Sequence, residues 1–114
     1  MSTRDHKLYL TYMVRAMEAI EKFAEGIDFE TLINDDLRSS AIIRKFEIIG
    51  EAAKNVPDDI KKSYPSIPWR EMAGMRDRLI HFYFGIKYEL VWNTIKNIIP
   101  QIKPLISKIL KEVE

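Results

Sequence analysis

The sequence predicts an all-α fold, an up-and-down bundle of four main helices built by residues 1–114 as a single domain. Apolar residues recur at three- and four-residue spacing along nearly the whole chain, which is the period of an amphipathic helix. Proline, glycine and aspartate interrupt this pattern where helices are expected to begin and end. No alternating apolar and polar segment bounded by turn residues is present, so we expect no sheet.

The first part of the chain predicts a long helix followed by a short one. The long helix carries an apolar stripe, and Gly26 is suited to end it because glycine tolerates the left-handed backbone of a helix C-terminus. Asp28 can cap a short helix from Phe29 to Ile33. The stripe consists of Tyr9, Tyr12, Met13, Ala16, Ile20, Phe23 and Ala24, which share one side of the helix.

A second long helix is predicted to follow, with Asp35 or Asp36 as its cap and its end near Asn55. Its apolar residues cover more than half of its circumference, so we expect it to pack on several neighbours. Its remaining polar face consists of Arg44, Glu47, Glu51 and Lys54. On this face we expect Glu51 to pair with Arg44 or Lys54, although it could also reach toward another helix.

Prolines organise the second half of the chain. Pro57 ends the second long helix, and Pro68 can open a helix that runs from about Trp69 to Phe84. Gly85 is the expected stop of that helix, and Gly74 inside it predicts a kink or a close packing contact.

The last segment, Lys87 to Glu114, is again helical in its apolar pattern. Pro100 should kink or split it, because proline lacks the N–H group that a helix interior uses. We expect Trp69 and Trp92 to act as packing anchors between the helices.

Composition and charge exclude several classes of protein. The net charge is +1, which argues against a broad basic surface for nonspecific nucleic-acid binding. There is no cysteine and there are only two histidines, so we expect no disulfide, no metal site and no cofactor. The N-terminus has no apolar core of a signal peptide, and no apolar run approaches the roughly 20 residues that span a bilayer. We therefore expect a cytoplasmic protein.

The segment Met75–Tyr83 carries the candidate chemistry. It places Arg76, His81 and Tyr83 within eight residues, as Arg, four residues, His, one residue, Tyr. The guanidinium of arginine is always charged and its fork matches phosphate oxygens. Histidine is the side chain best able to give and take protons near neutral pH. These groups together suit a phosphodiester substrate.

An ideal helix would display these groups on one arc. With Arg76 at 0°, simple winding puts Asp77 at about 100°, His81 at about 140° and Tyr83 at about −20°. Asp77 and His81 would be four residues apart and could touch, so the carboxylate would orient the imidazole. Ile80 falls among these polar residues, which favours an arc covered by a second subunit. A symmetric dimer would bring two Arg–His sets together.

The segment Arg76–Tyr83 resembles the Arg-x4-His-x-Tyr motif of the HepT-like toxins of the HEPN superfamily. The resemblance covers most of the chain. It includes Ile48 to Lys54, Tyr64 to Trp69 and the Leu90-Val91-Trp92 that follows the motif.

This resemblance implies an all-helical homodimer that acts as a metal-independent endoribonuclease. It implies that Arg76 and His81 are the catalytic pair, with Asp77 and Tyr83 in support. It also implies a partner, an MntA-like minimal nucleotidyltransferase antitoxin that neutralises the toxin by transferring AMP onto Tyr83. The pair would be a type VII toxin–antitoxin system.

Two other functions are compatible with the residues. The domain could be a non-catalytic helical docking partner of a minimal nucleotidyltransferase, with the polar arc as its interaction surface. A DNA-binding helix pair is a third possibility, but the net charge of +1 and the absence of a basic stripe weigh against it.

Overall fold

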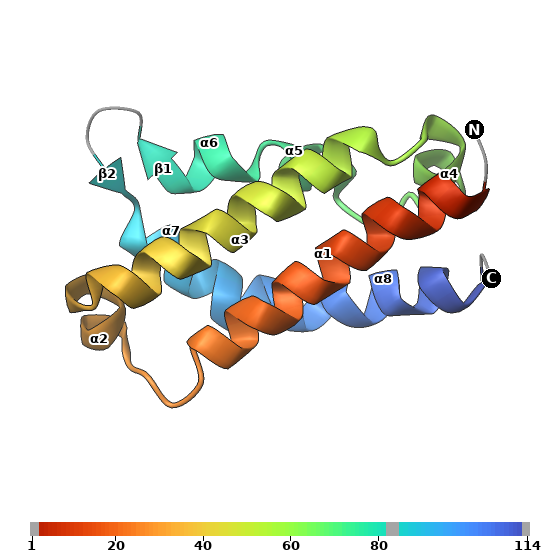
Figure 1. The fold of residues 1–114 in the computed structure, drawn as a ribbon. Helices are drawn as coiled ribbons and strands as arrows, with labels where there is room; N and C mark the ends of the chain where they lie inside the picture. The colour runs from red at the N-terminus through yellow and green to blue at the C-terminus, as the bar shows by residue number, and fades with distance from the viewer. Residues whose placement is uncertain (1–2, 82–84, 113–114) are drawn as a thin grey trace.

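The computed structural model describes residues 3–81 and 85–112, with the side chains of 7–80 and 85–112. Figure 1 shows an elongated bundle of helices, with extents of 43 × 29 × 21 Å. The elements are α1 (Thr3–Phe23), α2 (Phe29–Asn34), α3 (Asp36–Asn55), α4 (Asp58–Ser63), α5 (Trp69–Ala73), α6 (Met75–Leu79), β1 (Ile80–His81), β2 (Gly85–Ile86), α7 (Tyr88–Asn93), η1 (Thr94–Ile98) and α8 (Ile99–Glu112). The all-α fold class is thus confirmed.

The long helices α1 and α3 run side by side in opposite directions, and α8 packs along α1 (Figure 1). The helices α5 and α6 lie against α3. Apolar side chains between these helices form one core, and burying each large side chain contributes about 1.5–3 kcal/mol. The largest fully buried members include Leu10, Met13, Met17, Ile20, Phe46, Ile49, Met72, Ile106 and Ile109.

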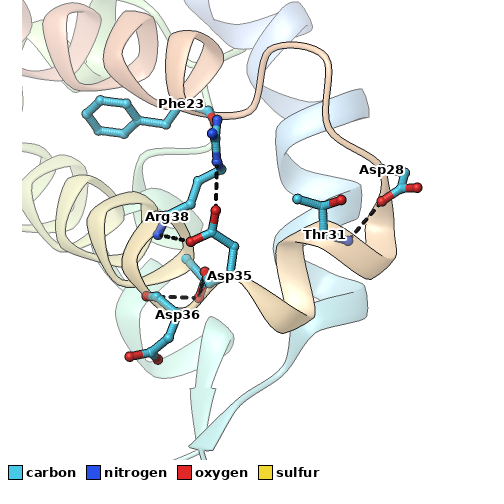
Figure 2. Close-up of polar contacts among 7 residues, drawn as sticks. Phe23, Asp28, Thr31, Asp35, Asp36 and Arg38 are labelled. Atoms are coloured by element: carbon cyan, nitrogen blue, oxygen red, sulfur yellow. Dashed lines mark hydrogen bonds and ion pairs between the residues drawn. The ribbon is translucent and has the colours of Figure 1, made fainter.

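The corner that joins α1, α2 and α3 is held by side-chain caps (Figure 2). Asp28 accepts a hydrogen bond from the backbone N–H of Thr31 at 2.8 Å, and this satisfies one free donor at the start of α2. Asp35 does the same for Arg38 at the start of α3, at 3.0 Å. The guanidinium of Arg38 in turn donates to the carbonyl of Phe23 at the end of α1. The predicted caps are confirmed.

The C-terminal segment is split near Pro100, as expected. The turn η1 is a π-helix, in which the N–H of Ile99 donates to the carbonyl of Thr94, five residues earlier. Pro100 has no N–H to donate and its ring would crowd a regular preceding turn, and the wider π turn lies directly before it, where the chain continues into α8.

The predicted helix from Trp69 to Phe84 is wrong at Ile80 and His81, and its last residues, 82–84, lie outside the described part of the chain. It breaks at Gly74, where a kink was expected, and α6 then ends at Leu79. The chain instead forms a short antiparallel ladder, in which Ile80 pairs with Ile86 and His81 pairs with Gly85. The expectation of no sheet therefore fails at this one hairpin.

A physical cause of the hairpin lies in its paired isoleucines. Ile80 and Ile86 stand opposite each other, and both pack against the core. Such β-branched pairs favour extended backbone over helix. Gly85 has φ +91°, a conformation that glycine adopts readily, and the N–H of Lys87 donates to the carbonyl of Leu79 at 2.8 Å.

No helix in the ranges 3–81 and 85–112 combines the length and the apolar character needed to cross a membrane.

Candidate active site

The motif residues are distributed over a helix end and a hairpin rather than along one helix. Arg76 and Asp77 lie on α6, and His81 is the second residue of β1. The helical backbone on which the expected angular arrangement depends is therefore absent at Ile80 and His81. The side chain of His81 and the whole of Tyr83 lie outside the described residues, so their expected contacts stay predictions.

Arg76 lies between two carboxylates. Its Nε is 3.5 Å from Oε2 of Glu47 on α3, and its Nη1 is 3.6 Å from Oδ1 of its neighbour Asp77. The Arg76 side chain is 47% exposed, so part of the guanidinium faces solvent and is open to a ligand. Exposed ion pairs of this kind contribute about 0–1 kcal/mol to stability, and their main effect here is to hold the side chain in one direction.

Asp77 was expected to orient His81. In the structure its carboxylate contacts Arg76 and is 85% exposed, which makes it the more open of the two carboxylates around that guanidinium. Asp77 lies on α6, four residues before His81, which belongs to β1.

A close approach of two backbones brings Glu47 and Arg76 together. A Cβ added at Gly50 would lie 3.3 Å from the carbonyl oxygens of both Met72 and Ala73. Only a residue without a side chain lets α3 come this near to α5 without displacement. Glu47 lies one turn before Gly50 on α3, and Arg76 begins the helix that follows α5, so this contact sets their separation.

Arg76 also borders an open groove of about 490 Å³ along α1 and α3. Aromatic residues of α1, charged residues of α3 and the start of α6 line it. The lining consists of Tyr9, Tyr12, Arg44, Glu47, Ile48, Gly50, Glu51, Ala52, Lys54, Asn55, Ala73 and Arg76.

One expectation about these residues is wrong. Glu51 forms no ion pair with Arg44 or Lys54, and within the described part of the chain neither cation has a carboxylate within 4.0 Å. Tyr12 belongs to the apolar stripe of α1, yet its side chain is 46% exposed in the groove. Helical periodicity defines which residues share a face, and it does not say whether a neighbouring helix covers that part of the face.

Arg78 faces away from this groove. It lines a separate cavity of about 210 Å³ next to Met75, Leu90 and Asn93. The two arginines of α6 therefore serve different surfaces, which makes Arg78 a natural control for Arg76.

The two tryptophans act as packing anchors, as expected. Trp69 is buried, and its indole N–H donates to the carbonyl of Tyr64 at 3.0 Å. Trp92 meets the ring of Phe29 edge to face, and Lys96 lies over it at 4.6 Å from the ring centre. Neither residue lines the groove beside Arg76.

Sequence reasoning did not identify Glu47 as a partner of Arg76. Its contact is tertiary and joins two helices distant in sequence, so no local pattern encodes it. The glycine in the middle of an otherwise strong helix was the available signal, because a helical glycine often marks a close backbone contact.

Comparisons with known proteins agree with the resemblance stated above. Residues 13–109 match the family model "Ribonuclease HepT-like". The chain is 49% identical over 108 residues to a Thermococcus cleftensis protein named "Probable ribonuclease HepT", covering 95% of this chain and 98% of that one. It is 46% identical over 114 residues to "Putative RNase MJ0125" of Methanocaldococcus jannaschii, covering 100% and 98%.

A longer relative shows the domain in another setting. The chain is 39% identical over 111 residues to a Methanocaldococcus jannaschii protein named "Gamma-glutamylcyclotransferase and putative RNase MJ0434", covering 97% of this chain and 50% of that one. No solved structure matches the chain.

Proposed function

The chain belongs to the ribonuclease HepT-like family, and from this premise we propose that it is a metal-independent endoribonuclease, the toxin of a type VII toxin–antitoxin pair that acts on RNA in the cytoplasm. Two relatives that are named as ribonucleases match this chain over nearly their full length, and they support the enzymatic part of this proposal. The remaining parts rest on the motif residues of this sequence and on the geometry around Arg76.

The observation that carries the proposal is the setting of Arg76. The Arg76 side chain is half exposed at the edge of an open groove, and two carboxylates contact its guanidinium. A guanidinium can donate two parallel hydrogen bonds to phosphate oxygens. Arg76 would therefore grip the phosphate to be cleaved and stabilise the negative charge that grows on its oxygens in the transition state.

His81 would transfer the protons. In the proposed reaction the ribose 2′-oxygen attacks the adjacent phosphorus, and the bond from phosphorus to the 5′-oxygen of the next nucleotide breaks. The 2′-hydroxyl loses its proton to a base, the leaving 5′-oxygen gains one, and a 2′,3′-cyclic phosphate is the product. An imidazole suits either proton transfer, and such catalysis contributes about 10²–10⁴-fold. The required 2′-hydroxyl selects RNA over DNA.

We propose a homodimer as the active form. One protomer supplies a single His81, whereas the reaction needs both a base and an acid. A twofold axis near the motif would place two copies of Arg76 and His81 beside one phosphate. Sedimentation of the purified protein at twice the mass of one chain is the expected result, and a monomer that cleaves RNA would contradict it.

The direct test is RNA cleavage in excess EDTA. Arg76→Ala and His81→Ala should each lose about 100-fold or more in rate, because each removes a group needed in the transition state. Arg78→Ala, an arginine on the same helix that faces another cavity, should cleave like the wild type. Cleavage products should end in a cyclic phosphate, and a 2′-deoxy substitution at the cut site should block the reaction.

Two outcomes would overturn the catalytic assignment. One is equal cleavage by His81→Ala and the wild type, and the other is strict dependence on added metal. If the wild type neither cleaves RNA nor arrests growth when expressed alone, the alternative of a non-catalytic docking partner of a nucleotidyltransferase is favoured instead.

For regulation we propose that a minimal nucleotidyltransferase antitoxin of the MntA type transfers AMP onto Tyr83. The modification would add bulk and negative charge two residues after His81, where an RNA phosphate would otherwise bind. Co-expression with a nucleotidyltransferase encoded beside this gene should add the mass of AMP to the intact chain. Tyr83→Phe should abolish the addition, and an unmodified wild-type chain would contradict the proposal.

A further inference from the structure

The wall of the groove opposite α3 is aromatic. Tyr9 and Tyr12 lie three residues apart on α1 and both line the groove. Tyr9 is half-buried against the core, whereas Tyr12 is 46% exposed, so its ring is accessible from the groove. An exposed aromatic ring beside a cavity offers a flat face on which a nucleobase can stack.

The α3 side of the groove carries charged residues of both signs, two of which are cations. Arg44 and Lys54 are exposed on α3 and lie ten residues apart, which is about 15 Å along a helix axis. The groove lining has three cations, Arg44, Lys54 and Arg76, and two carboxylates, Glu47 and Glu51. Its net charge is therefore +1. Within the described residues neither Arg44 nor Lys54 is engaged by a carboxylate, so both are available to an anionic ligand.

We propose that this groove is a subsite for the single-stranded RNA next to the cleaved linkage. Tyr12 would stack on one base, and Arg44 and Lys54 would contact the flanking phosphates. The proposal rests on the function proposed above, in which Arg76 holds the phosphate that is cut.

The size and position of the groove favour this occupant. Its volume of about 490 Å³ lies within the range of about 300–1,000 Å³ that is usual for small-molecule sites, so it can hold a nucleotide. Arg76 belongs both to the groove and to the motif, so a strand lying in the groove leads directly to the cleavage position. Stacking plus phosphate contacts along a groove is the common mode of binding for single strands.

The proposal is tested by binding rather than by cleavage. The full chain carrying His81→Ala is titrated against a short fluorescent single-stranded RNA of mixed sequence, and anisotropy gives the Kd. Adding Tyr12→Ala should raise the Kd about 5- to 150-fold, whereas Tyr12→Phe, which keeps the ring, should bind within about twofold of its parent. Leu37→Ala removes an exposed apolar side chain away from the groove and should change nothing.

The charged wall is tested by salt dependence. The double change Arg44→Ala and Lys54→Ala should weaken binding and lower the slope of log Kd against log salt by about 1.4, because two phosphate contacts are lost. Lys62→Ala on α4, an exposed lysine outside the groove, should leave the slope unchanged.

The outcomes separate this inference from the proposed function. An unchanged Kd in Tyr12→Ala, with RNA cleavage still dependent on Arg76 and His81, would overturn the subsite alone. RNA binding that depends on Tyr12 in a chain that never cleaves RNA would support the groove and overturn the nuclease. If Tyr12→Ala converts a dimer into a monomer in sedimentation, the groove is a contact between two copies of the chain and the subsite is wrong.

Discussion

Glu47 Oε2 lies 3.5 Å from Nε of Arg76, so that a carboxylate of α3 holds the guanidinium at the start of α6. The Nε contact leaves the terminal nitrogens of Arg76 directed toward other partners, one of which is Asp77 at 3.6 Å. Glu47 therefore acts as a positioning residue for Arg76, since it touches the arginine from a neighbouring helix.

The first prediction concerns Glu47→Gln. This change keeps the size of the side chain and removes its charge, so Arg76 loses its anchor. We expect kcat for RNA cleavage to fall about tenfold, because a misplaced catalytic group lowers the rate even when it still binds. KM should stay equal or fall, since a negative charge near the phosphate is removed.

Steady-state kinetics and thermal unfolding check this prediction together. Glu18→Gln, an exposed glutamate on α1, is the matched control and should leave kcat unchanged. The unfolding temperature should change little in either variant, because an exposed ion pair contributes at most about 1 kcal/mol. A Glu47→Gln enzyme with wild-type kcat would show that Arg76 needs no anchor.

The second prediction concerns Arg76→Lys. Lysine keeps the positive charge but presents a single ammonium in place of the planar fork. We expect a rate loss of about 10- to 150-fold, which corresponds to one charged hydrogen bond of about 1.5–3 kcal/mol. Arg78→Lys on the other side of α6 should retain the wild-type rate. If Arg76→Lys keeps full activity, the arginine contributes only its charge, and the proposed pair of hydrogen bonds to the phosphate is wrong.

Local signals in the sequence were sufficient to predict most of the helix boundaries. Asp28 and Asp35 are caps that act within three residues, and Gly26, with φ +74°, follows the end of α1 as expected. Such features depend only on the backbone next to them, so the sequence displays them directly. The helical period likewise defined the faces of α1, α3 and α8.

Long-range contacts set the limit of that prediction. The end of α6 depends on the pairing of Ile80 with Ile86, and β-branched residues accept either helix or strand according to what they pack on. The exposure of Tyr12 and the Arg76–Glu47 pair depend on how closely α1 and α3 approach their neighbours. Those distances come from the assembled core and are not encoded in any single segment.

The third prediction concerns Gly50, where α3 crosses α5. Alanine favours a helix by up to about 1 kcal/mol over glycine, but a methyl group here would press on two backbone carbonyls at 3.3 Å. We expect Gly50→Ala to lower the free energy of unfolding by about 1 kcal/mol net. The two close carbonyl oxygens belong to the backbone of α5, which moves aside less easily than a side chain would. Gly74→Ala is the matched control.

At Gly74 a Cβ would meet nothing closer than 3.6 Å, and the backbone there has negative φ. Gly74→Ala should therefore be neutral or stabilise the fold by up to about 1 kcal/mol. Urea unfolding of both variants gives the comparison. A stabilised Gly50→Ala would mean that α3 and α5 can separate without loss, and that the spacing of Glu47 and Arg76 is not set by this contact.

The last prediction concerns the pH dependence of stability at the α1–α2–α3 corner (Figure 2). The backbone N–H of Arg38 donates to the carboxylate of Asp35, and this hydrogen bond holds the pKa of Asp35 below its ordinary value of 3.8. Because the folded-state pKa is lower than the unfolded one, the charged cap stabilises the fold above about pH 4. That stabilisation is lost as the pH falls through the folded-state pKa.

Asp35→Asn keeps an oxygen that can accept the capping hydrogen bond but cannot ionise. We expect the wild type to be more stable than this variant at pH 7, and the difference to shrink toward zero as the pH falls below 4. Urea unfolding of both proteins across this range measures it, and comparing the two cancels the similar contribution of Asp28, whose pKa is also lowered, by its hydrogen bonds with Thr31. Asp36→Asn, an exposed neighbour, is the matched control. A gap between the wild type and Asp35→Asn that stays constant from pH 7 to pH 3 would show that the charge of Asp35 contributes nothing to the cap.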